Sequence, residues 1–229
     1  MYTNVFTILP LTCAIFVFFF GLFVLYQDHK SPMNRLMFGF CMTMFLWMFG
    51  TFMMFATRLS DPARSVFWDR FVYAGVVFMP PFMHHFSLLF TGRKNQRKLL
   101  WINYLLAFFF LLISRTSYFV DGLYVYSWGA HTKAQLWHHI FLGYFFVGTG
   151  IFFYNIATYA RGLKDEILIL QARYAFMAFA IVIFMGGSAY LYAYGIDTKF
   201  PFIINYYLYK FSFFKLSFNK FITNSKINY

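Results

Sequence analysis

Long apolar runs without charged residues in their interiors constrain this chain more than any other feature. Six such runs cover residues 5–26, 36–57, 71–91, 99–114, 139–160 and 174–194. A helix needs about 20 residues to cross the hydrocarbon core of a bilayer, and all runs except the short fourth reach that length. The runs do not alternate in polarity as barrel strands do, so helices are the structures that satisfy the backbone in lipid. The sequence therefore predicts an all-α integral membrane helical bundle with six clear transmembrane helices.

A seventh span over residues 200–218 is left open. Lys210 and Lys215 interrupt it, and each costs about 3 kcal/mol near a helix centre. Residues 206–229 use almost only Tyr, Phe, Lys, Asn, Ile, Ser and Leu, which adenine- and thymine-rich DNA encodes by default. We therefore divide the chain into a polytopic membrane domain (residues 1–201) and a low-complexity tail (residues 202–229), which we interpret as a truncated or frame-shifted seventh span.

Lys and Arg between the runs indicate the orientation. If the N-terminus lies outside, nine of these cations fall in inner connections and six in outer ones. Cytoplasmic loops carry the excess of Lys and Arg, and the loop at residues 92–98 has four cations and no acid. The expected location is a bacterial inner membrane, crossed several times, with the N-terminus outside.

The net charge of +12 would suggest nucleic acid as a partner if the chain were a soluble domain. However, 61% of the residues are hydrophobic and only 11% are charged, against about 25% in soluble domains. We therefore expect the cations to meet anionic lipid headgroups, with the bilayer as a partner and no nucleic acid.

Four polar residues are predicted at membrane depth: His84, His85, Asn103 and Asn155. Such groups are functional candidates, and a His pair could ligate haem or a metal. Neighbouring residues on a helix point about 100° apart, however, and His138 lies near the opposite face of the membrane. Hydrogen bonds between helices are the favoured interpretation, so we predict no metal site and no cofactor.

Proline and glycine pairs punctuate two of the runs. Pro80 and Pro81 should bend the third span or act as a hinge. Gly186 and Gly187 should let a neighbouring helix approach the sixth span, and three glycines should do the same for the fifth. Those three are Gly143, Gly148 and Gly150.

Three stretches together suggest a family. Residues 62–75 lead through Phe78-Met79-Pro80-Pro81 to residues 85–92, and residues 126–129 precede Leu136, His138 and Phe141. The third stretch has Gln171, Arg173, Gly186-Gly187 and residues 194–196 before Pro201. Over residues 5–201 these features resemble the N-terminal seven-transmembrane sensory region of bacterial histidine kinases, which is also found before diguanylate cyclases.

The resemblance implies a sensory input module of a signal-transduction protein, with seven helices and a cytoplasmic output domain. That output domain is not recognisable in this sequence, and neither phosphate loops nor nucleophile elbows are present, so we predict that the chain is not an enzyme. An unknown small ligand would bind between the outer halves of the helices, near Trp68, Tyr73, Trp128 and His138. Ligand binding would change helix packing, and a cytoplasmic signalling partner or a second copy of the chain would respond to that change.

Two other functions are left open by the sequence. One is a small membrane redox or transport protein that uses the intramembrane histidines. The other is a nonfunctional, truncated remnant of a longer gene.

Overall fold

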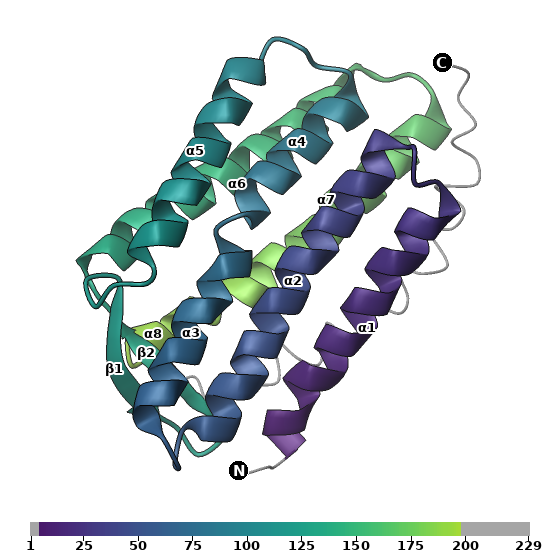
Figure 1. Cartoon of the computed structure of the whole chain (residues 1–229). Coiled ribbons are helices and arrows are strands. Elements are labelled where there is room, and N and C mark those ends of the chain that lie inside the picture. The colour runs from purple at the N-terminus through teal and green to yellow at the C-terminus, as the bar shows by residue number, and fades with distance from the viewer. Residues whose placement is uncertain (1–4, 198–229) are drawn as a thin grey trace.

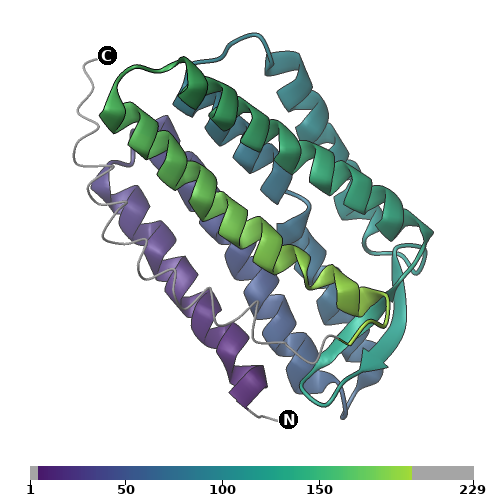
Figure 2. The same cartoon turned by 180° about the vertical axis from the view of Figure 1, so that it is seen from behind.

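The computed structural model describes residues 5–197 and consists of a helical bundle with a β-hairpin at one end (Figure 1). The helices are α1 (Val5–Gln27), α2 (Pro32–Thr57), α3 (Pro62–Val76), α4 (Met79–Thr91), α5 (Arg97–Ile113), α6 (Leu136–Gly162), α7 (Glu166–Gly187) and α8 (Tyr190–Ala193). Strands β1 (Val120–Val125) and β2 (Ala130–Ala134) form the hairpin. Figure 2 shows α7 on the far side of the bundle, packed beside α6.

Five helical segments of the described chain are long and apolar enough to span a membrane: α1, α2, α3 together with α4, α6 and α7. This confirms the predicted helical membrane bundle. The predicted fourth span, residues 99–114, corresponds to α5, which has 17 residues and lies beside α4 and α6. It is shorter than a usual span, so the count of six stays a prediction. The predicted seventh span and the tail at residues 202–229 lie outside the described residues.

The third span begins earlier than the apolar run predicted. The Asp61 side chain accepts a hydrogen bond from the Arg64 amide at 3.0 Å, and Pro62 takes the first helical position. This combination is a strong helix start, because the cap satisfies a free amide and proline needs none. Asp69 therefore lies two turns inside α3 rather than in an outer connection.

The third span is interrupted between α3 and α4 at residues 77 and 78. Pro80 and Pro81 have no amide hydrogen, so the carbonyls four residues earlier lose their helical donors. The Tyr144 hydroxyl of α6 donates to one of them, the carbonyl of Val77, at 3.0 Å. A neighbouring helix thus satisfies the backbone that the prolines leave open.

The long connection after α5 folds back over the bundle as the β-hairpin. Its many Tyr and Trp residues would favour the outer membrane face, but it packs on α3, α8 and α2. Phe119 and Thr132 are fully buried, and Trp128 is 6% exposed. The backbone amides and carbonyls of the two strands are hydrogen-bonded to each other. The hairpin can therefore pack over the end of the bundle, where its side chains are buried.

Candidate functional site

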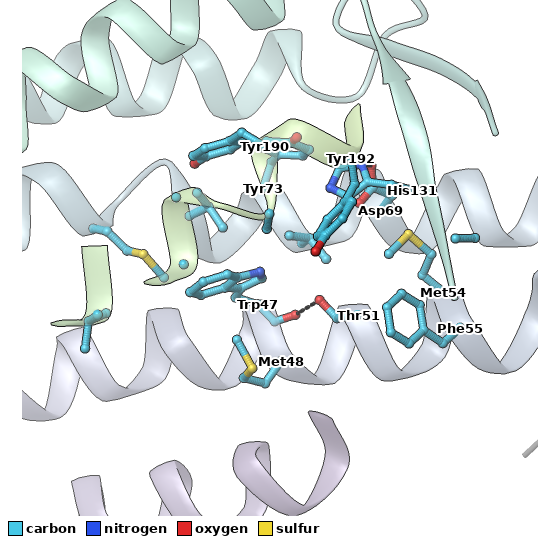
Figure 3. A pocket seen from close by; sticks show the side chains of 18 of the residues that line it. Trp47, Met48, Thr51, Met54, Phe55, Asp69, Tyr73, His131, Tyr190 and Tyr192 are labelled. Carbon is cyan, nitrogen blue, oxygen red and sulfur yellow. Dashed lines mark hydrogen bonds and ion pairs between the residues drawn. The ribbon is translucent and has the colours of Figure 1, made fainter. Parts of the chain in front are cut away.

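A cavity lies inside the hairpin end of the bundle, where α2, α3, α7, α8 and β2 meet (Figure 3). Its volume is about 60 Å³. A cavity of that volume suits only a small molecule and is too small for haem. The walls are largely apolar, and the residues used below are Trp47, Thr51, Phe55, Asp69, Tyr73, Trp128, His131, Gly186, Gly187, Tyr190 and Tyr192.

Asp69 gives the cavity its charge. The side chain comes from α3 and is 1% exposed. Thr132 of β2 donates a hydrogen bond from its hydroxyl to Oδ2 of Asp69. His131 Nδ1 lies 4.0 Å from the same oxygen, at the limit of an ion pair. Figure 3 shows Asp69, His131 and Tyr192 together on one side of the cavity.

Aromatic side chains form much of the remaining wall. Trp128 packs edge-on to Tyr192, with ring centroids 4.5 Å apart, and lies 5.8 Å from Phe55. Tyr126 stacks on the other face of this group, 5.0 Å from Trp128, and donates its hydroxyl to the Tyr192 carbonyl at 2.8 Å. Burial, together with the nearby Asp197 carboxylate, raises the pKa of Tyr126 to about 12.

Two of the four predicted ligand residues line the cavity, namely Tyr73 and Trp128. His138 lies behind Tyr73: it is fully buried, and its Nε2 is 2.9 Å from the Tyr73 hydroxyl. Its Nδ1 is 3.3 Å from the Tyr194 hydroxyl. Trp68 does not line the cavity and packs against Phe49, its ring centroid 5.9 Å away. His138 therefore lies behind the cavity wall, in contact with Tyr73.

The predicted glycine and proline positions differ in what they contact. Gly186 and Gly187 both line the cavity, but only Gly186 packs so closely on Trp47 that a Cβ would overlap the indole. A Cβ on Gly187 would meet open space. Pro80 packs against α6, where a Cβ on Gly148 would lie 2.7 Å from its Cβ.

A polar network joins α4, α6 and the α4–α5 loop at the opposite end of the bundle. The amides of Gln96 and Asn155 bond each other reciprocally, at 2.9 Å and 3.0 Å. His84 Nε2 lies 3.0 Å from Gln96 Oε1, so this nitrogen donates. Asn155 also donates to the Ser87 hydroxyl at 3.0 Å, and Arg93 donates to Asn155 Oδ1 at 2.6 Å.

The other predicted intramembrane polar residues have separate surroundings. His85 Nδ1 lies 3.2 Å from the Tyr104 hydroxyl. Within the described residues, the side-chain amide of Asn103 is buried without a hydrogen-bond partner. In the same part of the chain, no three His, Cys, Asp or Glu residues come close enough together to hold a metal ion.

Sequence reasoning missed Asp69 and His131 as cavity residues and Gln96 and Arg93 as network residues. A signal for Asp69 was present, because Asp61-Pro62 predicts a helix start. On that helix Asp69 precedes Tyr73 by four residues, so both side chains share one face. For His131 no local signal exists, because only the hairpin register brings β2 onto α3.

The chain was compared with known proteins. A family model described as the N-terminal 7TM region of histidine kinase matches residues 9–222. Comparison with curated proteins and with solved structures gives no match.

Proposed function

Because the chain belongs to the family of N-terminal seven-transmembrane regions of histidine kinases, we propose that it detects a small molecule in its hairpin-end cavity. It is a membrane sensory input module. The binding of that molecule would change helix packing and be read at the opposite end of the bundle.

The observation that carries this proposal is the composition of the cavity walls. They come from α2, α3, α7, α8 and β2, so one small molecule would touch segments far apart in the sequence. A ligand shifts an equilibrium only by its differential affinity for two states. A cavity at the junction of several helices gives such a difference, because any change in helix spacing changes its size and shape.

Two structural features support transmission away from the cavity. The interrupted third span connects the cavity residues of α3 to α4, and Met79 at the start of α4 itself lines the cavity. At the far end of α4, the network of His84, Gln96 and Asn155 joins this helix to α6. A shift of α4 against α6 would therefore either break or re-form these hydrogen bonds. Discrete changes of this kind are how small movements become switches.

The orientation belongs to the proposal as well. We place the hairpin end outside a bacterial inner membrane, together with the N-terminus, and the loop containing Arg93 and Lys94 inside. The excess of cations in the α1–α2, α4–α5 and α6–α7 connections supports this orientation.

The output is proposed to lie outside this sensory region. The one family matched is a sensory region, with no catalytic domain found in the 229 residues. Phosphotransfer or cyclase chemistry would then be carried by a further segment or a cytoplasmic partner that contacts the inner loops.

Hydrogen exchange on a cavity-filled variant tests the proposal. Gly187→Leu adds a side chain at a cavity position where a Cβ has open space. We expect it to change amide exchange in residues 92–96 and 154–158, measured by mass spectrometry on protein in lipid nanodiscs. Gly143→Leu is the matched control, because Gly143 also has open space around a Cβ but does not line the cavity. Equal exchange in both variants would refute the coupling of the cavity to the network.

A further inference from the structure

We infer that the cavity selects small organic cations, with an ammonium group held by Asp69 against aromatic walls. This inference rests on the proposed function and adds the chemical class of the ligand. Three observations carry it: the state of the Asp69 carboxylate, the position of the basic side chains around it, and the chemistry of the remaining wall.

Asp69 is a buried carboxylate with few polar partners. In the described part of the chain, its carboxylate receives one hydrogen bond, from Thr132, and no Lys or Arg lies within ion-pair distance. A carboxylate can accept about four hydrogen bonds. Burying an ionised group without a partner is costly, so an incoming cation would gain from an interaction that the free protein leaves unmade.

The basic groups near Asp69 donate no hydrogen bond to its carboxylate in the described part of the chain. Arg70 follows it in α3, but its guanidinium lies 3.6 Å from Asp121 and donates to the Val120 carbonyl at 3.0 Å. His131 Nδ1 lies 3.1 Å from the Thr132 carbonyl, an acceptor, so this nitrogen donates its proton there. At 4.0 Å from Asp69 the imidazole gives no hydrogen bond to the carboxylate.

The other walls favour a cation with an apolar body. Trp47, Phe55, Trp128 and Tyr192 surround the space, and aromatic faces attract ammonium groups within about 6 Å. Anions are disfavoured, because Asp69 would repel them and no Arg or Lys lines the cavity among the described residues. The cavity volume of about 60 Å³ is small, so the ligand is a small amine, and a one-ring amine would have to widen the cavity as it binds.

Three probes of nearly equal shape test the inference on the full chain in nanodiscs. They are 2-phenylethylamine (a cation), 2-phenylethanol (neutral) and phenylacetate (an anion). Trp47 and Trp128 line the cavity, so intrinsic fluorescence reports occupancy. We expect saturable binding of the amine, at least tenfold tighter than binding of the alcohol, and weaker binding still of phenylacetate.

Asp69→Asn removes the charge but keeps an oxygen that can accept from Thr132. We expect at least a tenfold loss of amine affinity and little change for the alcohol. Glu166→Gln is the control, because it removes an exposed carboxylate at the start of α7 that does not line the cavity. Its amine affinity should equal that of the original chain.

Each outcome separates the inference from the proposed function. If the alcohol binds as well as the amine, or if Asp69→Asn binds the amine unchanged, the cavity is a ligand site but the selection of cations is refuted. If none of the three probes binds saturably, the inference is overturned and the cavity loses its support as a ligand site. The comparison of probes on the unmodified chain holds even if Asp69→Asn fails to fold.

Discussion

Replacing Gly148 by alanine should loosen the contact between α6 and the proline segment of α4. A Cβ at Gly148 would lie 2.7 Å from the Cβ of Pro80, whereas carbon atoms prefer about 3.5–4.0 Å. The pyrrolidine ring is fixed to the backbone and cannot rotate away, so the helices must separate by about 0.8 Å or more. Overpacking of this kind costs about 1–3 kcal/mol.

Two glycines on the same helix provide the reference for this prediction. At Gly143 and Gly150 an added Cβ would have nothing within 4 Å, so alanine there meets open space. All three substitutions gain about 1 kcal/mol of helix propensity, and that gain cancels in the comparison. Gly148→Ala should therefore be about 1–3 kcal/mol less stable than either control, or several degrees lower in Tm.

The assay is thermal unfolding of the purified variants in one detergent, followed by helical circular dichroism. Equal melting temperatures for all three alanine variants would refute the packing of α4 on α6 at Pro80. A lower melting temperature for all three would indicate instead that alanine is unfavourable anywhere on this helix.

Three further predictions follow from the hydrogen bonds. Asn155→Ala should lower the free energy of unfolding by about 1–2 kcal/mol, because it leaves part-buried donors of Gln96 and Arg93 without this acceptor; thermal unfolding measures this. Tyr144→Phe should cost about 1 kcal/mol by removing the donor to the Val77 carbonyl, whereas Tyr174→Phe, at an exposed position, should cost nothing measurable in the same assay. Tyr126 should ionise near pH 12 in the folded protein, above the ordinary value of 10.0, and a difference titration at 295 nm against Tyr126→Phe measures it. Since its folded-state pKa is raised, its contribution to stability is present below pH 10 and is lost as the pH rises toward about 12.

The bundle and the family could be predicted from the sequence because both depend on features that persist along the chain. Apolar length decides whether a helix can cross lipid, and the resemblance to the histidine kinase sensory region is confirmed by the match over residues 9–222. The start of the third span was placed too late, because the apolar run begins after the helix itself. Asp61 and Pro62 mark the true start by capping rather than by hydropathy.

Which glycine contacts a neighbour could not be predicted from spacing. The sequence does not distinguish Gly143, Gly148 and Gly150, yet of these three only Gly148 packs closely against another helix. That distinction depends on the rotation of α6 about its axis, which is set by packing. A membrane helix without charged residues has similar side chains on its lipid-facing and its packed faces, so the sequence says little about this rotation.

Two of the residues predicted to bind a ligand lie at the cavity, and their role stays a prediction. Tyr73 and Trp128 were chosen for their position near the outer ends of the helices, and both line it. Asp69 and His131 meet only because residues 120–134 fold into a hairpin over α3. A prediction based on apolar runs and helices does not detect such a hairpin. His131 therefore could be placed at the cavity only from the structure, whereas the helix start at Asp61-Pro62 already puts Asp69 on the face of Tyr73.

The distance between the inner loops tests the sensory account most directly. Spin labels on Lys94→Cys and Lys164→Cys would report the α4–α5 and α6–α7 loops by double electron–electron resonance, while the native Cys13 and Cys41 are buried. The account predicts that Gly187→Leu, which fills the cavity, shifts the distance distribution by about 1–2 Å or more, and that Gly143→Leu leaves it unchanged. Identical distributions in the unmodified chain and in both variants would contradict the claim that the cavity is coupled to the opposite end of the bundle.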